Sequence, residues 1–166
     1  MSKPTGEDAE EMESMIPKAF FVTGGKAIVK ISELNAFDHA LKNAGIAQCN
    51  LVKVSSIIPP NCREIAPMEI PVGSITYAVI SKAEGRDGRI SAGIAWGFAE
   101  GKEFGFVAEA YGSMDEEATK KILKERIQGM AETRGVSLCN VKYRIETLNV
   151  PKGSYGCVVV ALVYVF

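Results

Sequence analysis

Apolar and polar residues alternate over short stretches of the chain, or form short apolar runs between turns rich in glycine and proline. Both patterns predict β-strands. We expect about seven strands, drawn from eight candidate segments: 19–23, 27–30, 49–56, 74–82, 89–98, 103–111, 138–150 and 157–165. The glycines at 24 and 25 are expected to turn the chain, and residues 57–72 are expected to form a loop after the serine pair. The run 158–163 is apolar on both faces, which indicates a central or doubly covered strand.

Two segments carry the apolar spacing of helices instead. The first is expected to begin at Ser32, a favoured N-cap residue, and to end before Gly45. Its apolar residues follow i, i+3, i+7 spacing and define one face: Leu34, Phe37 and Leu41. The second helix is expected from residue 113 or 115 to about Arg134.

Two helices among many strands are typical of an α+β protein with largely antiparallel sheets, and we expect a layered αββα sandwich. Residues 1–16 are polar and acidic and have no apolar periodicity, so we interpret them as a disordered tail. Residues 17–166 are then expected to form one domain, because a 166-residue chain with 47% hydrophobic content can build a single core.

The composition narrows the classes of function. A formal net charge of -1 gives no bulk electrostatic reason to bind nucleic acid or an anionic membrane. No apolar segment is long enough to span a bilayer, and the acidic start is unlike a secretory signal, so we expect a cytoplasmic protein. The 4 cysteines lack CxxC spacing and are expected to be reduced. The single histidine, His39, excludes a multi-histidine metal centre, and we expect no metal.

Asp38 is the first of three candidates for chemistry. It lies four residues after Leu34 and three before Leu41, on or at the edge of the apolar helix face. A carboxylate is costly to bury there unless it is paired. It is either a helix-edge acid partnered by a nearby Lys or Arg, or a carboxylate that awaits a cationic ligand. A planar guanidinium is a good partner for such a carboxylate.

Glu109 is the second candidate. Strand alternation places Val107, Glu109 and Tyr111 on one face of the strand that ends near residue 111. Glu109 is either an exposed acid on a half-buried strand or, if the sheet is covered on both sides, a partly buried acid suited to donating a proton.

The third candidate is the Ser55-Ser56 pair, which follows an apolar strand and precedes Ile-Ile-Pro-Pro. Composition alone indicates that the serine pair lies at the end of a strand and the start of a turn. A serine held in a strained bend can nevertheless attack the carbonyl before it, and elimination from the resulting ester leads to a pyruvoyl group. The attack needs a hydrogen-bond donor at the Ser55 carbonyl, and the side-chain amide of Asn50, on the same strand, could serve.

A long pattern without gaps contains most of these candidates: LNAFDHAL at 34–41, NAGI at 43–46 and NLVKVSSIIPP at 50–60. This pattern closely resembles the pyruvoyl-dependent arginine decarboxylase family. Further similar segments are 71–73, 90–92, the strand ending near Glu109, the helix ending at 134–135 and the strand after 156–157. The resemblance extends over about residues 17–166.

The resemblance implies that the chain cleaves itself between Ser55 and Ser56. Cleavage would give a smaller chain (17–55, plus the tail) and a larger chain (56–166) that begins with a pyruvoyl cofactor made from Ser56. Asn50 matches the asparagine that assists cleavage in the family.

The resemblance also implies substrate roles. Asp38 matches the acid that holds the substrate guanidinium, Leu34 and Leu41 would line the pocket, and Glu109 matches the acid thought to be the proton donor. The implied reaction converts L-arginine to agmatine and carbon dioxide through a Schiff base, for polyamine biosynthesis. The implied assembly is a homotrimer, or a dimer of trimers, with active sites at subunit interfaces.

Two alternatives remain open. One is a pyruvoyl decarboxylase that acts on another cationic amino acid, such as lysine or ornithine. The other is an uncleaved, non-catalytic paralogue, which is disfavoured by the presence of Asn50, Ser56 and Glu109.

Overall fold

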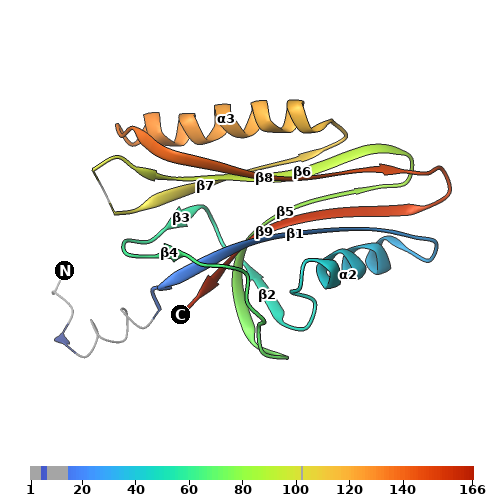
Figure 1. Ribbon diagram of the computed structural model, residues 1–166, viewed down its shortest axis with the longest axis horizontal. Coiled ribbons are helices and arrows are strands. Elements are labelled where there is room, and N and C mark those ends of the chain that lie inside the picture. The colour runs from blue at the N-terminus through green and yellow to red at the C-terminus, as the bar shows by residue number, and fades with distance from the viewer. Residues whose placement is uncertain (1–4, 7–14, 102) are drawn as a thin grey trace.

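Two β-sheets packed face to face, with one helix on the outer side of each, form the protein in its computed structural model (Figure 1). The structure describes residues 5–6, 15–101 and 103–166. The expected α+β class with mostly antiparallel sheets is confirmed. The elements are β1 Ala19–Val29, α2 Glu33–Asn43, β2 Asn50–Lys53, β3 Ile57–Ile58, β4 Arg63–Glu64, β5 Ile75–Gly85, β6 Gly88–Ala99, β7 Gly105–Gly112, α3 Glu116–Thr133, β8 Leu138–Val150 and β9 Tyr155–Val165.

The first sheet has the strand order β2-β5-β9-β1-β4. β9 runs through its middle and pairs antiparallel with β5 on one side and β1 on the other. The edge strands β2 and β4 pair in parallel with β5 and β1. β9 is buried along nearly its whole length, which confirms the prediction of a central or covered strand.

The second sheet has the order β3-β7-β6-β8, and every pair in it is antiparallel. Helix α3 covers its outer face with Leu123 and Ile127. The side chain of Asp115 accepts a hydrogen bond from the backbone N–H of Ala118 and caps this helix. Ser32 caps α2 in the same way. Both caps are among the predicted helix starts.

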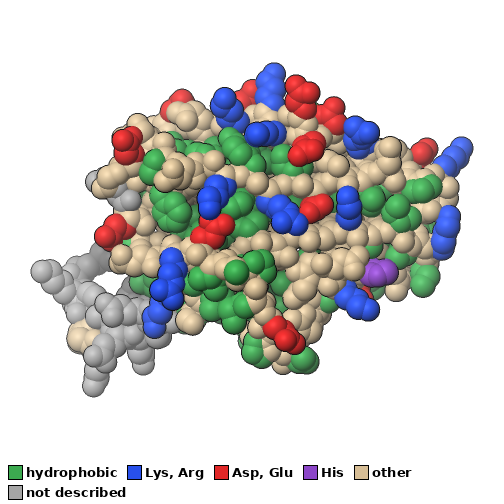
Figure 2. All heavy atoms as spheres, in the orientation of Figure 1, with side chains coloured by type: hydrophobic (Ala, Val, Ile, Leu, Met, Phe, Trp, Pro, Cys, Tyr) green, Lys and Arg blue, Asp and Glu red, His purple; other side chains and the backbone are tan. Residues whose placement is uncertain are grey.

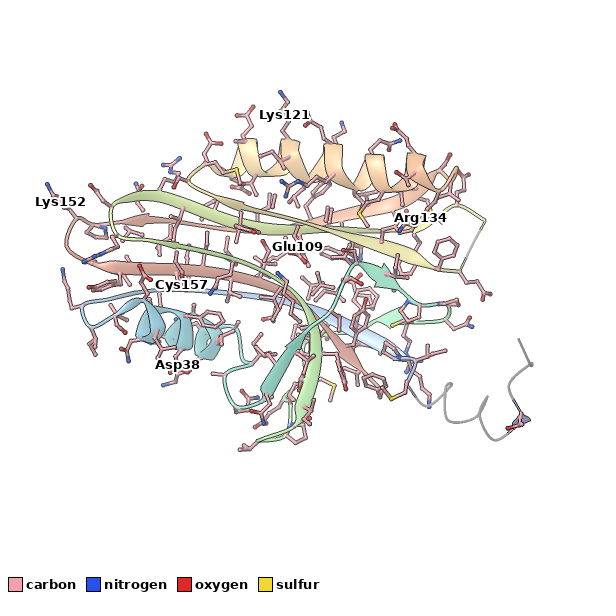
Figure 3. All side chains as sticks on the ribbon, turned by 180° about the vertical axis from the view of Figure 1, so that it is seen from behind. Asp38, Glu109, Lys121, Arg134, Lys152 and Cys157 are labelled. Carbon is pink, nitrogen blue, oxygen red and sulfur yellow. The ribbon has the colours of Figure 1, made fainter. Side chains whose placement is uncertain are left out.

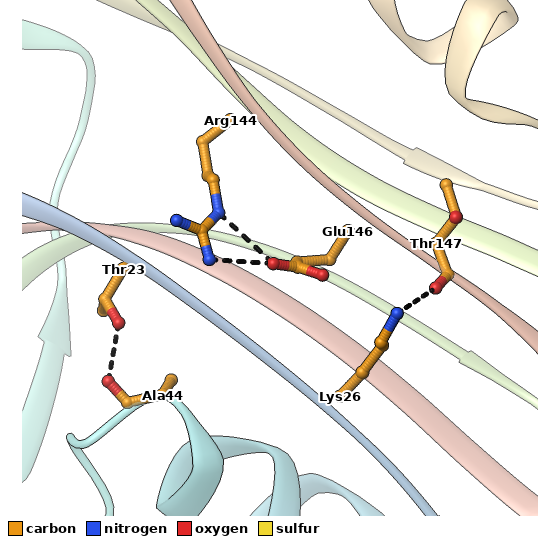
Figure 4. Close-up of polar contacts among 6 residues, drawn as sticks. All are labelled: Thr23, Lys26, Ala44, Arg144, Glu146 and Thr147. Atoms are coloured by element: carbon orange, nitrogen blue, oxygen red, sulfur yellow. Dashed lines mark hydrogen bonds and ion pairs between the residues drawn. The ribbon is translucent and has the colours of Figure 1, made fainter.

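The layer between the sheets is apolar, and polar contacts close it along one side. Phe20 and Leu162 of the first sheet pack there against Ile94 and Val107 of the second. On the side that Figure 4 shows, Lys26 Nζ of β1 donates to the carbonyl oxygen of Thr147 on β8 at 3.3 Å. The two sheets are therefore held together by both apolar packing and polar contacts.

The predicted turn at Gly24-Gly25 is wrong, because β1 continues through it without interruption. Helix α2 packs directly over this point. A Cβ atom added at Gly25 would lie 2.2 Å from the carbonyl oxygen of Ala40, which no real side chain allows. The glycine therefore serves the close approach of helix and strand, rather than a turn.

The predicted apolar face of α2 is only partly correct. Leu41 is buried against the first sheet, but Leu34 is 75% exposed. The fully buried helix residues are instead Ala36 and Ala40. Small side chains let the helix backbone approach β1 closely, so the buried stripe is turned toward the alanines and away from Leu34.

The segment predicted as a loop at 57–72 contains the two-residue strands β3 and β4. Of the predicted disordered tail, residues 1–4 and 7–14 lie outside the described residues.

All 4 cysteines have free thiols. Within the described ranges, no helix is long and apolar enough to cross a membrane, and no cluster of side chains suits a metal ion. Acidic and basic side chains are interspersed on the face in Figure 2.

Candidate active site

The Ser55-Ser56 pair lies where the chain crosses from the first sheet to the second. Before it, the N–H of Val54 donates to the carbonyl oxygen of Ala78 in the first sheet at 3.0 Å. After it, the carbonyl oxygen of Ser56 accepts from the N–H of Val107 in the second sheet at 2.9 Å. The peptide bond between the two serines is thus flanked by hydrogen bonds to different sheets.

The two serines line different hollows. Ser55 lines an apolar pocket of about 270 Å³, together with Tyr77, Tyr164 and Phe166. Ser56 lines an open groove of about 690 Å³ that also contains Glu109. A group built on Ser56 would therefore meet a carboxylate in an accessible groove.

Glu109 lies on β7, and strand alternation puts it on the face that β7 turns toward the first sheet. Its neighbours Ala108 and Ala110 pack toward α3, and Val107 packs between the sheets, which confirms the predicted division of faces. The Glu109 side chain is 20% exposed, and its Oε2 lies 3.4 Å from Nζ of Lys53 at the end of β2. Glu109 is thus a partly buried acid with a cation beside it.

Helix α3 forms the other wall of the groove. Arg126 donates from its guanidinium to the backbone carbonyl oxygen of Glu109. Arg134 places its guanidinium carbon 5.0 Å from the ring centroid of Phe106. Both arginines line the groove with Ser56, so the groove contains two cations in addition to the carboxylate.

A third hollow, smaller than the groove of Ser56, is lined by Lys53. It measures about 310 Å³ and is lined by Phe37 of α2, Lys53 of β2, Lys82 of β5 and Tyr111 of β7. Nζ of Lys82 lies 4.4 Å from the centroid of the Phe37 ring. Because Phe37 precedes Asp38 directly, this hollow connects the helix of the predicted substrate acid with the strand of Glu109.

The structure does not bring every predicted site residue into the groove. Asp38 and Leu34 are exposed on α2, and Leu41 is buried beneath that helix. Figure 3 shows Asp38 on the outer side of α2, whereas Glu109 lies on β7 in the other sheet. One described chain therefore brings Ser56 and Glu109 into one groove, has Ser55 in a different pocket, and leaves the acid predicted to bind guanidinium on a separate surface.

The side-chain amide of Asn50 has a partner other than the serine pair within this chain. Its Nδ2 donates to the carbonyl oxygen of Gly73 at 3.0 Å. Three residue steps along an extended strand already separate Asn50 from Lys53 by about 10 Å, before the chain reaches Ser55. The Asn50 amide is thus engaged elsewhere in this chain, and its role at the Ser55 carbonyl stays a prediction.

Sequence reasoning missed Lys53, Arg126 and Tyr164. Lys53 is a charged residue in an apolar strand, and this signal could have marked it. Arg126 resembles the other charged residues on the exposed side of α3, and nothing local distinguishes it. The hydroxyl of Tyr164 donates to the carbonyl oxygen of Ile57 at 2.7 Å, a contact between distant segments.

These observations define the structural class of the protein, before any comparison with known families. The protein is an α+β sandwich that carries a serine pair at a crossover between sheets, and the second serine shares a groove with an acid. Comparison with known proteins then gives the family. The model of the pyruvoyl-dependent arginine decarboxylase family matches residues 19–166, and the chain belongs to that family.

Relatives from several organisms are similar over most of the chain. The pyruvoyl-dependent arginine decarboxylase of Methanopyrus kandleri is 36% identical over 149 residues, which cover 90% of this chain and 97% of the relative. That of Methanothermobacter thermautotrophicus is 36% identical over 136 residues, with 80% and 87% covered. Pyruvoyl-dependent arginine decarboxylase 2 of Archaeoglobus fulgidus is 36% identical over 131 residues, with 74% and 81% covered.

Proposed function

We propose that this protein decarboxylates L-arginine to agmatine and carbon dioxide, with a pyruvoyl group that it makes from Ser56 by cleaving its own chain after Ser55. The observation that carries the proposal is the serine pair at the sheet crossover, with Ser56 in the same groove as Glu109. Membership of the family supports the same chemistry.

The fold can tolerate a break at the crossover. β1 and α2 belong to the smaller fragment, whereas β9 belongs to the larger one. β1 pairs with β9 from Ala19–Val165 to Val29–Tyr155, and α2 packs on the same sheet. An extended ladder and a shared core therefore hold the two fragments together after the Ser55–Ser56 bond is cut.

A pyruvoyl group at position 56 fits the geometry of the groove. Such a group supplies a ketone that condenses with an amine and an adjacent amide carbonyl that accepts the electrons left by carbon dioxide. The oxygen of that amide carbonyl is the Ser56 oxygen, which already accepts a hydrogen bond from the N–H of Val107 at 2.9 Å. This fixed donor would stabilise negative charge on the oxygen.

Glu109 is the proposed proton donor to the former α-carbon of the substrate. Its carboxyl group lies in the groove of Ser56, is partly buried and is held beside Lys53. Partial burial limits exchange with bulk water, and the two flanking strands fix the position of the acid. Both conditions suit general acid catalysis.

Asp38 and Asn50 are proposed to act from a neighbouring copy of the chain. Both are exposed, and neither lines the groove of Ser56 in one protomer. Exposed apolar side chains lie close to them in the sequence, including Leu34, Val52 and Ile75. Burial of these side chains in a homotrimer, or in a dimer of trimers, would bring Asp38 to the substrate guanidinium of the adjacent copy.

The activity is tested with purified protein and L-arginine, L-lysine or L-ornithine as substrate. We expect release of carbon dioxide and formation of agmatine from arginine alone. Glu109→Gln is expected to cleave itself normally but to lose about 10²- to 10⁴-fold of the turnover. Decarboxylation of lysine or ornithine instead of arginine would contradict the proposed substrate. If Glu109→Gln folds normally but does not cleave itself, then Glu109 acts in self-cleavage and not as the proton donor in decarboxylation.

A further inference from the structure

Tyr164 carries a buried hydroxyl group that the proposed decarboxylation does not use. It lies near the end of β9 and is 6% exposed. Its hydroxyl donates to the carbonyl oxygen of Ile57 at 2.7 Å. Ile57 follows Ser56 directly and begins β3 in the second sheet, so this bond joins the first sheet to the chain just beyond the serine pair.

The environment keeps this hydroxyl protonated. Burial raises the pKa of Tyr164 well above its ordinary value, and the nearby thiol of Cys62 adds to the shift. The group therefore remains a neutral donor throughout the pH range in which a protein works. The hydrogen bond itself is partly buried, which limits competition from water.

Two consecutive peptide groups after the proposed cleavage point are held by the bonds of Val107 and Tyr164. The N–H of Val107 donates to the carbonyl oxygen of Ser56, and the hydroxyl of Tyr164 donates to that of Ile57. Before the cleavage point, Val54 is bonded to Ala78 in the first sheet. The backbone is therefore held by hydrogen bonds on both sides of the bond proposed to be cut.

We propose that Tyr164 is a positioning residue for self-cleavage, because its hydroxyl holds the chain beyond Ser56 in the geometry that the attack requires. The inference rests on the proposed function. In the step concerned, Oγ of Ser56 loses its proton and bonds to the carbonyl carbon of Ser55. The C–N bond between the two residues breaks, the nitrogen takes up a proton, and an ester remains. Tyr164 does not touch these reacting atoms.

The test compares Tyr164→Phe with Ser81→Ala during pulse-labelled cell-free synthesis. The hydroxyl of Ser81 is also buried, and it donates from the first sheet to the carbonyl oxygen of Ala110 in the second at 2.9 Å. Each variant therefore removes one side-chain hydrogen bond between the sheets, a buried one for Ser81 and a partly buried one for Tyr164. We expect Tyr164→Phe to slow self-cleavage by about tenfold to a hundredfold, and Ser81→Ala to cleave at the wild-type rate.

Two further measurements separate positioning from folding. Replacement of Tyr164 by 4-aminophenylalanine, which keeps an N–H donor in the same place, should restore cleavage. Hydroxylamine, which intercepts the ester, should not restore the cleavage rate of Tyr164→Phe, because the ester itself forms slowly. The melting temperature of each variant measures separately how far the substitution destabilises the fold.

The outcomes are distinct. Wild-type cleavage together with unchanged cleavage of Tyr164→Phe would overturn the inference and leave the proposed function intact. Equal slowing of Tyr164→Phe and Ser81→Ala would also overturn it, since the effect would then follow from stability. Absence of cleavage in the wild-type chain would overturn both the inference and the proposed function.

Discussion

Nζ of Lys53 lies 3.4 Å from Oε2 of Glu109, and this ion pair joins the last residue of an edge strand in the first sheet to β7 in the second. Lys53 is also three residues before Ser56, so the cation, the acid and the serine come from segments that meet at the sheet crossover. We expect this pair to orient the carboxyl group that we propose as proton donor.

Lys53→Met is expected to lower kcat by about tenfold while self-cleavage proceeds normally, because the carboxyl group of Glu109 loses its orienting partner. The stability should change by less than about 1 kcal/mol, since the Lys53 side chain is 59% exposed. The measurements are steady-state kinetics with arginine and thermal unfolding.

Lys142→Met is the matched control for Lys53→Met. Its side chain is 58% exposed and pairs with Glu64 at 2.9 Å, on β8 and β4 away from the serines. It should leave kcat unchanged. An equal loss of kcat in both variants, or an unchanged kcat in Lys53→Met, would contradict the orienting role of Lys53.

Asp38 and Glu109 are expected to serve one active site from two different copies of the chain. Asp38→Asn alone should raise KM for arginine by about tenfold or more, because a guanidinium–carboxylate bond is lost. Co-expression of Asp38→Asn chains with Glu109→Gln chains should yield assemblies whose kcat/KM for arginine exceeds that of either variant alone, because some sites then combine the intact Asp38 of one chain with the intact Glu109 of another. The measurement is agmatine formation by the purified mixed assembly. If mass measurement shows that mixed assemblies form but their activity does not rise, then Asp38 and Glu109 act in the active site of the same chain.

Gly25→Ala is expected to destabilise the fold by about 1–3 kcal/mol, because the new methyl group would collide with the backbone of α2. Gly129→Ala is the contrasting change. Gly129 lies inside α3 with nothing within 4 Å of an added Cβ, so alanine there should stabilise the helix by about 0.5–1 kcal/mol. Urea unfolding in the Ser56→Ala background, where a single chain unfolds, measures both. Equal effects of the two substitutions would argue against close packing of α2 on β1.

The strands of this fold could be predicted from sequence because most are long and strongly patterned. The limits expected for the last long hairpin, 138–150 and 157–165, differ from β8 and β9 by at most two residues. Local signals failed where packing decides. Gly24-Gly25 has the composition of a turn, yet the approach of α2 makes it part of a strand, and β3 and β4 are too short to carry any periodicity.

The candidate site was only partly visible in the sequence. Strand alternation correctly placed Glu109 on the face opposite Ala108, because that inference needs only local geometry. Its nearness to Ser56 depends on the pairing of β3 with β7, where Ile57 lies opposite Phe106. Pairing between distant segments is set by the whole fold and leaves no local pattern. Asp38 is expected from the sequence on or at the edge of an apolar helix face that includes Leu34, yet both residues are exposed.

The intact mass of the purified protein under denaturing conditions tests the central claim most directly. The account predicts two fragments divided between Ser55 and Ser56, with the larger one lighter by one ammonia than a fragment that begins with serine. Ser56→Ala should give one full-length mass and no agmatine. A single full-length mass for the wild-type chain, or a larger fragment that still begins with serine, would contradict the account.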